Sequence, residues 1–334
     1  MKRILVCGGG GFIGGAMALR LKGEGNFVRI ADIKNHEFID MQSAVDEVCI
    51  GDLCDAGFAD EVCSGGIDEI YQFAADMGGA GYIFTGENDA NVMYNSAHIN
   101  LNLAKMSVKH KVKRIFYSSS ACMYPEYNQL DPDNPNCEES SAYPAAPDSE
   151  YGWEKLFSER LWMAFARNHS LTVRIARYHN IFGPEGTWDG GKEKAPAAMC
   201  RKAALAKDGD SIEVWGDGLQ TRSFLYIDEC IEATRRLMDS ECAEPLNIGS
   251  EKMVTINELA EIAIKLSGKK LVINNIEGQD FVAKYGFECP VGVRGRNSNN
   301  TLYLKNIGWT VNNDLEFGMK ATYPWILGQS KINQ

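Results

Sequence analysis

The sequence lacks the basic surplus of proteins that coat nucleic acids or anionic membranes. Its 334 residues include 34 lysines and arginines but 45 aspartates and glutamates, which gives a formal net charge of −11. We therefore expect no nucleic-acid or membrane partner. Long hydrophobic runs are also missing: no segment approaches the roughly 20 apolar residues of a membrane span. The apolar run at residues 4–7 is too short for a signal peptide.

Paired cysteines and clustered histidines are missing as well. The ten cysteines are scattered without a CxxC pair, and the five histidines do not lie at the spacing of metal ligands. This usage predicts free thiols in a cytoplasmic protein and no metal site.

Short apolar runs alternate with helical stretches through the first half of the chain. Strands are predicted at residues 3–7, 27–32, 47–52, 69–74, 114–120 and 171–176, and helices at 13–21, 91–109 and 151–169. Unbroken apolar strands joined by helices indicate a parallel sheet that is covered on both faces. We therefore predict an α/β fold with a doubly wound parallel sheet of the Rossmann type and a smaller C-terminal substrate domain.

The pattern changes near Gly183. The stretch from there to Gly218 is expected to be rich in loops, and a final helix is predicted at residues 256–266, before a polar C-terminal region. We expect a Rossmann domain over residues 1–180 and a nucleotide-sugar-binding domain over 181–334, with part of 224–250 returning to the first domain. The acidic segment 131–141 is expected to be a solvated loop.

A glycine-rich turn separates the first predicted strand from the first predicted helix. Gly8, Gly11 and Gly14 would let the backbone approach a pyrophosphate at the positive N-terminus of that helix. Asp32 ends the second strand, where a carboxylate accepts hydrogen bonds from a ribose diol and repels a 2′-phosphate. The cofactor predicted is thus NAD rather than NADP. The alternative is a tight turn without a ligand. Asp52 is a candidate for the adenine edge or, equally, for a helix cap.

Tyr151 and Lys155 lie four residues apart on a predicted helix and so share a face. An ammonium beside a phenol favours the phenolate, which is a usable base for a hydroxyl proton. Ser118, Ser119 and Ser120 end a strand, at the edge of the sheet where ligands bind in such folds. With the glycine turn, these residues resemble the extended short-chain dehydrogenase/reductase family of nucleotide-sugar enzymes. The resemblance implies that Ser120, Tyr151 and Lys155 pass a proton while NAD takes a hydride from C4 of the sugar.

Cys122 sets the chain apart from most of that family. It follows Ser120 by two residues, so an extended backbone would place both side chains on one side. A thiol near positive charge can take a proton from carbon. Taken alone, Cys122 is more simply a buried structural cysteine and Lys194 a solvated surface lysine.

Longer strings narrow the resemblance to the GDP-mannose 3,5-epimerase family, over nearly the whole chain. The strings are residues 75–79, 119–126, 178–184, 188–202, 215–224 and 292–296. By this resemblance Cys122 and Lys194 are a proton-transfer pair. Oxidation at C4 makes the hydrogens at C3 and C5 acidic, both centres invert through an enolate, and reduction at C4 gives GDP-L-galactose and/or GDP-L-gulose. NAD is not consumed, so the enzyme is an isomerase.

The site residues that the resemblance implies fall into three groups. The catalytic residues are Cys122, Lys194, Tyr151, Ser120 and Lys155. The residues expected to bind NAD are Gly8, Gly11, Phe12, Ile13, Gly14, Asp32, Asp52, Leu53, Tyr151 and Lys155. The residues expected to hold the GDP-sugar are Gly78, Ser120, Ala121, Cys122, Asn180, Glu193, Lys194, Ala195, Lys202, Gln220, Thr221, Arg222, Arg294 and Arg296.

One departure and three alternatives stay open. Residues 279–289 form an insertion relative to the plant members, so the preference for nucleotide or sugar is open. An enzyme that inverts only C3 or C5 would use the same residues, whereas a 4-epimerase acting on another GDP-hexose would not need Cys122 or Lys194. A non-catalytic NAD-binding sensor would keep only the glycine turn. Relatives of this type are commonly dimers, so we expect a homodimer with a GDP-sugar as its small-molecule substrate.

Overall fold

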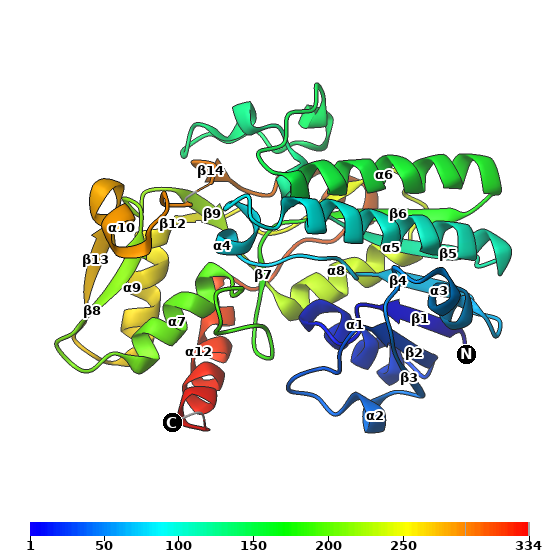
Figure 1. Cartoon of the computed structure of the whole chain (residues 1–334), viewed down its shortest axis with the longest axis horizontal. Coiled ribbons are helices and arrows are strands. Elements are labelled where there is room, and N and C mark those ends of the chain that lie inside the picture. The colour runs from blue at the N-terminus through cyan, green and yellow to red at the C-terminus, as the bar shows by residue number, and fades with distance from the viewer. Residues whose placement is uncertain (291, 333–334) are drawn as a thin grey trace.

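A seven-stranded parallel sheet forms the centre of the computed structural model, which describes residues 1–290 and 292–332 (Figure 1). Its strand order is β11-β6-β5-β4-β1-β2-β3. The strands are β1 (Arg3–Cys7), β2 (Phe27–Asp32), β3 (Glu47–Ile50), β4 (Glu69–Gln72), β5 (Arg114–Ser120), β6 (Thr172–Tyr178) and β11 (Leu246–Ile248). The doubly wound sheet predicted from the sequence is confirmed. The order reverses between β1 and β4, and in such sheets ligands bind outside the carboxyl ends at this point.

Helices cover both faces of this sheet (Figure 1). One face carries α1 (Phe12–Gly23) and α8 (Ile227–Asp239), and the other carries α3 (Ala56–Cys63), α5 (Asp89–Lys109) and α6 (Glu150–His169). Alternate residues of β1 point to opposite faces: Val6 packs in a core with Met17 of α1, whereas Leu5 packs in a second core with Trp162 of α6. Because both faces are covered, the central strand β1 is apolar at four of its five positions, as the sequence pattern indicated.

A smaller group of elements lies beside the carboxyl edge of the sheet (Figure 1). Its helices are α7 (Ala195–Leu205), α9 (Ile256–Ser267), α10 (Gly278–Tyr285) and α12 (Leu315–Ile332), whereas α11 (Thr301–Ile307) packs against β11 of the large sheet and bonds to α8. Its strands form three small sheets. Strand β8 (Ser211–Trp215) pairs with β13 (Val272–Ile276), and β7 (Ile181–Phe182) pairs with β10 (Leu225–Tyr226). In the third sheet, β9 (Thr221–Ser223) lies between β12 (Met253–Thr255) and β14 (Gly295–Arg296). Two short helices, α2 (Met41–Ala44) and α4 (Ala80–Ile83), lie in loops of the large sheet. A domain boundary at residue 180 stays a prediction.

Two sequence-based expectations for the second half were wrong. The region expected to be rich in loops contains α7, in which Pro196 occupies the first turn, where its missing N–H costs nothing. The C-terminal region holds α12, which continues through Pro324 because Leu315, Met319 and Tyr323 bury one face. In the first half, the segment 131–141 is a mainly exposed loop, as expected, although its Cys137 is only 1% exposed. In the described part of the chain, no helix has both the length and the apolar character needed to cross a membrane.

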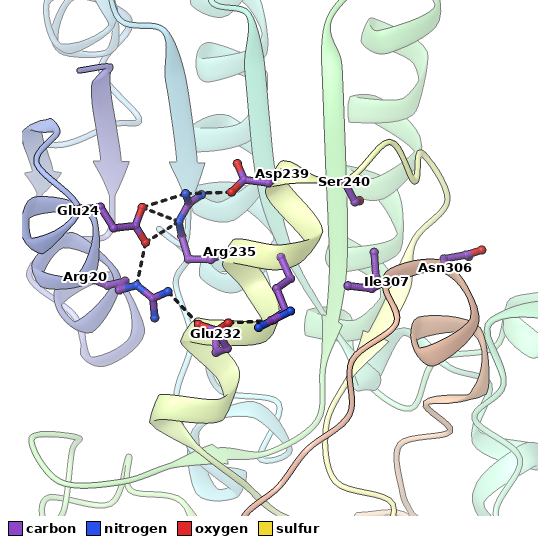
Figure 2. A pocket seen from close by; sticks show the side chains of 9 residues that line it. Arg20, Glu24, Glu232, Arg235, Asp239, Ser240, Asn306 and Ile307 are labelled. Carbon is purple, nitrogen blue, oxygen red and sulfur yellow. Dashed lines mark hydrogen bonds and ion pairs between the residues drawn. The ribbon is translucent and has the colours of Figure 1, made fainter.

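An ion-pair network fastens α8 to α1 (Figure 2). The buried Arg235 guanidinium donates hydrogen bonds to Glu24 at 2.9 Å, to Asp239 at 3.1 Å and to the Tyr71 hydroxyl. Glu24 also accepts from Arg20 of α1 at 2.7 Å. The network therefore connects Glu24 and Arg235, which are more than 200 positions apart in the sequence, on one face of the sheet.

Replacing Arg235 with methionine should lower the free energy of unfolding by about 2–3 kcal/mol, as expected when one partner of a largely buried pair is removed. The loss falls at the low end because Glu24 and Asp239 keep side-chain exposures of 28% and 54%. Urea unfolding followed by circular dichroism measures it. Arg236→Met is the matched control: Arg236 is 45% exposed and pairs with Glu232, so about 0.5 kcal/mol is expected. Equal losses in the two variants would contradict a special contribution from Arg235.

Candidate active site

The turn between β1 and α1 is tight enough to require glycine. Gly8 has a φ of +83°, and a Cβ there would lie 2.7 Å from the Ala74 nitrogen. A Cβ on Gly14 would lie 2.1 Å from the Gly8 oxygen. Gly11 is the N-cap of α1 and provides no side-chain cap, so the first-turn amides of α1 are left for an anion. Phe12 and Ile13 follow directly in that first turn.

Asp32 lies beside this turn at the end of β2. Its carboxylate accepts hydrogen bonds from the Gly10 amide at 2.9 Å and the Lys34 amide at 3.1 Å. Burial raises the pKa of Asp32, and these backbone bonds oppose the shift. An oriented carboxylate next to an uncapped helix N-terminus fits the ribose and pyrophosphate of a dinucleotide.

Asp52 and Leu53 follow the next strand. Asp52 is exposed and accepts a hydrogen bond from the Cys54 amide at 2.8 Å, and Leu53 is 3% exposed in the core. Asp52 does not cap a helix, because the N-cap of α3 is Asp55. The adenine contact of Asp52 stays a prediction.

Tyr151 and Lys155 project from the first turns of α6, whose N-terminus is capped by the Ser149 side chain. The Lys155 ammonium donates to the Ser118 main-chain oxygen at 3.0 Å and lies 5.6 Å from the centre of the Tyr151 ring. Burial lowers the pKa of Lys155. Burial and the neighbouring Cys122 raise the pKa of Tyr151, although a hydrogen bond with Ser120 acts the other way. The pKa of Tyr151 is therefore raised by burial, and not lowered as the expected stabilisation of the phenolate by Lys155 would predict.

The backbone after β5 does not stay extended, contrary to the sequence-based expectation. Residues Ala121–Met123 form a 3-10 turn, and the Ser120 hydroxyl accepts a hydrogen bond from the Cys122 amide at 3.2 Å. Ala121 is buried at 2% exposure. Cys122 nevertheless packs against the cluster that contains Tyr151. The turn, rather than strand periodicity, brings the thiol to the tyrosine.

Arg296 of β14 joins Cys122 to two residues that the sequence did not reveal. Its guanidinium donates to the Cys122 sulfur at 3.0 Å, to Gln129, and to Asp148 at 3.5 Å. Burial acts to lower the pKa of Arg296, but Cys122 and Asp148 raise it above its ordinary value. Gln129 and Asp148 belong to the irregular segment between β5 and α6, where no periodicity or motif singles them out.

A second arginine lies beside Arg296. Arg222 donates to the main-chain oxygens of Thr221 at 2.8 Å and Val293 at 2.7 Å. Burial and the nearby Arg296 lower the pKa of Arg222 to about 9. Two neighbouring guanidinium groups create a local site for an anion within an acidic protein.

Lys194 approaches the same cluster from the N-cap of α7, which begins at Ala195. Its ammonium donates to the Gly78 main-chain oxygen at 3.3 Å. Burial lowers the pKa of Lys194; Cys122 is near enough to act in the opposite direction. Glu193 accepts from Arg201 at 2.7 Å, which fixes the segment before α7. Lys194 is therefore a half-buried functional candidate and not a solvated surface lysine.

Lys202 and Gln220 lie farther out, around β8. The Lys202 ammonium donates to the Glu213 main-chain oxygen at 2.7 Å, and Gln220 donates to the Trp215 main-chain oxygen at 3.3 Å. Gln220 is 6% exposed, and its Oε1 has no hydrogen-bond partner among the residues that the structure describes. A buried acceptor without a partner is costly unless a ligand satisfies it.

The remaining predicted substrate residues have structural partners. Asn180, at a φ of +45°, donates to a main-chain oxygen of β9 at 2.9 Å. The Thr221 hydroxyl donates to the Pro132 oxygen. Arg294 is part-exposed and pairs with Asp217 at 2.9 Å, away from the Cys122 cluster. Their binding roles stay predictions. Within the described ranges 1–290 and 292–332, no three His, Cys, Asp or Glu side chains are grouped so that they could hold a metal ion.

Changing Gly14 to alanine should weaken NAD binding at least tenfold, about 1.4 kcal/mol, because the added Cβ forces the turn open. The NAD released from purified, denatured protein is quantified by chromatography. Gly23→Ala, at the other end of the same helix, is the control because its Cβ would meet nothing within 4 Å. Equal NAD contents in the two variants would contradict the assignment of the turn.

Comparisons with known proteins agree with this geometry. The model of the NAD dependent epimerase/dehydratase family matches residues 4–249. The chain is 44% identical to GDP-mannose 3,5-epimerase of Arabidopsis thaliana, over 98% of this chain and 82% of that protein. A Thermotoga maritima UDP-glucose 4-epimerase structure shares the fold at a TM-score of 0.82 and 23% identity, covering 100% of both chains. A Thermus thermophilus UDP-glucose 4-epimerase in complex with NAD matches at a TM-score of 0.80 and 19% identity, covering 98% of this chain and 99% of that one. The chain belongs to the NAD dependent epimerase/dehydratase family.

Proposed function

We propose that this enzyme is a GDP-mannose 3,5-epimerase that uses NAD. The observation that carries the proposal is the position of Cys122, which lies close to Lys194 on one side and to Tyr151 and Ser120 on the other. The 44% identity to the plant GDP-mannose 3,5-epimerase over 98% of the chain supports the same substrate. The product is GDP-L-galactose, GDP-L-gulose or both.

The reaction needs groups that move protons to and from both oxygen and carbon. When bound, NAD supplies reversible oxidation of an alcohol and a positive charge next to it. Ser120 and Tyr151 hold the C4 hydroxyl, and Tyr151 exchanges its proton, with Lys155 stabilising the phenolate. Once C4 is a ketone, hydrogens on C3 and C5 are acidic because the carbanion is an enolate. Cys122 then removes a proton from one face of the ring and Lys194 supplies one to the other.

Arginine and lysine side chains are suited to hold the GDP part of the substrate. Arg222 and Arg296 form the inner pair next to Cys122, and Lys202 and Gln220 lie at the outer end. Guanidinium groups bind phosphate oxygens in pairs, and an ammonium binds them as a point charge. This order supports a pose with the sugar at the Cys122 end and the nucleotide toward β8.

Two other functions have less support. A 4-epimerase on another GDP-hexose needs no acid–base pair at carbon, so the burial of Lys194 next to Cys122 would be without purpose. A non-catalytic NAD sensor needs neither that pair nor Tyr151 with Lys155. An enzyme that inverts only C3 or C5 uses the same cluster, and the experiment below separates it from the double epimerase.

Incubation of the wild-type protein with GDP-mannose in D₂O should place deuterium at C3 and C5 without added cofactor, as followed by NMR. Cys122→Ala should slow this exchange at least 100-fold, the usual contribution of a general base, while the NAD content stays unchanged. Lys194→Met should also slow turnover. Cys242→Ala and Lys207→Met are the controls outside the cluster. Exchange at one carbon only would show a single-centre epimerase, and normal exchange by Cys122→Ala would contradict the base assignment.

We also propose that the protein is a cytoplasmic homodimer. An apolar hollow lies on α6 and the loop before it, lined by Tyr143, Ala145, Trp153, Leu156 and Phe157 with Arg160 at its edge. Tyr143, Trp153 and Phe157 are 53%, 40% and 46% exposed. Aromatic side chains grouped in this way are typical of protein interfaces. The free state of all ten thiols in the structure favours a reducing compartment.

The double variant Trp153→Glu/Phe157→Glu should be monomeric, because a dimer would have to bury its added charges. Light scattering coupled to gel filtration gives the mass directly. Phe317→Glu, at an exposed phenylalanine of α12, should leave the mass unchanged. A dimeric Trp153→Glu/Phe157→Glu variant would exclude this face as the interface.

A further inference from the structure

The insertion at residues 279–289 forms most of α10, which packs onto β8 (Figure 1). Phe281 is fully buried and meets the Trp215 ring edge-on, at 5.2 Å between ring centres. Tyr285 also contacts Trp215, at 5.4 Å, and Phe287 completes the aromatic group. Helix α10 is therefore held in place by buried rings and is not a loose appendage.

The polar contacts of α10 all converge on one carboxylate. The Lys284 ammonium and the Tyr285 hydroxyl both bind Glu213, one at each carboxylate oxygen. The Trp215 indole N–H donates to Glu213 as well, at 3.2 Å. Burial acts to raise the pKa of Glu213, but these bonds lower it below its ordinary value. Glu213 is thus an ionised carboxylate whose acceptor positions are occupied from α10 and β8.

Lys202 contacts the same residue through a different atom. Its ammonium binds the main-chain oxygen of Glu213 at 2.7 Å, and lies 6.0 Å from the centre of the Trp215 ring. A main-chain oxygen carries no net charge, so it leaves the ammonium able to attract an anion. A carboxylate bonded there would neutralise it, whereas the Glu213 carboxylate acts on Lys202 from farther away: burial lowers the pKa of Lys202, and Glu213 only partly opposes this shift.

We propose that α10 withdraws the Glu213 carboxylate from Lys202, so that the Lys202 ammonium is available to an oxygen of a guanosine diphosphate. The inference rests on the proposed function and adds a role for an insertion that the sequence left unexplained. Gln220 provides an independent observation at the same place. Its buried Oε1 lacks a partner in the described part of the chain, and guanine presents N–H donors that such an acceptor can bind.

The test is a charge-rescue experiment on the NAD-loaded protein, with GDP binding measured by calorimetry. In Lys284→Met/Tyr285→Phe, the Glu213 carboxylate loses two partners and can turn to Lys202, so GDP should bind about five to ten times more weakly, as for the loss of one charge-assisted contact. Adding Glu213→Gln to that variant should restore binding to within about twofold, because no competing charge is left. Lys320→Met, on α12, is the control for removal of a lysine charge.

The outcomes separate this inference from the proposed reaction. No loss of GDP affinity in Lys284→Met/Tyr285→Phe would overturn the inference, and so would a loss that Glu213→Gln fails to restore, since that would show a purely structural role for α10. Failure of the wild-type protein to bind GDP would overturn it as well. Normal GDP binding and rescue without exchange of sugar hydrogens would count against the epimerase reaction alone.

Discussion

The guanidinium of Arg296 is the group on which the geometry of the candidate site depends. It binds the sulfur of Cys122, the amide of Gln129 and the carboxylate of Asp148, which come from three different places between β5 and α6. Arg296 itself lies on β14, more than 140 positions later in the chain. The N–H donors of this one guanidinium therefore hold β14 and the irregular segment between β5 and α6 together around the Cys122 thiol. A lysine could not replace it, because a single ammonium cannot satisfy three acceptors in one plane.

The same arrangement accounts for the charge of the site. Arg222, Arg296, Lys155 and Lys194 are all withdrawn from solvent, and burial acts to lower the pKa of each. Positive groups packed in this way are costly without anions. Cys122 and Asp148 supply part of the compensation for Arg296. The remainder is suited to an anion, so a protein with a net charge of −11 still offers a locally positive site, which the proposed function assigns to a diphosphate.

The sequence predicted those features that depend on short-range chemistry. The glycine turn was visible because steric contacts between Gly8 and Gly14 leave no room for a Cβ. The spacing of Tyr151 and Lys155 follows from one helical turn. Gln129 and Asp148 were missed because their partner is remote in sequence and the intervening backbone has no period. Helix α7 was missed for a different reason: Gly190, Gly191 and the basic residues near them indicated a loop, although the alanine-rich residues 195–205 favour a helix, which packs against α9 and α12.

The two ends of the site are built from different parts of the chain, and this separation explains how an insertion can be accommodated. Ser120, Tyr151 and Lys155 are fixed by β5 and α6, whose positions follow from the large sheet. Lys202 and Trp215 are fixed by α7 and β8, and the side chains of α10 contact Glu213 and Trp215 of β8. A change in α10 can therefore alter how the nucleotide end is held without moving the acid–base groups. Since the reaction depends on the inner groups and affinity on both, recognition of the nucleotide can vary while the chemistry at the sugar stays the same.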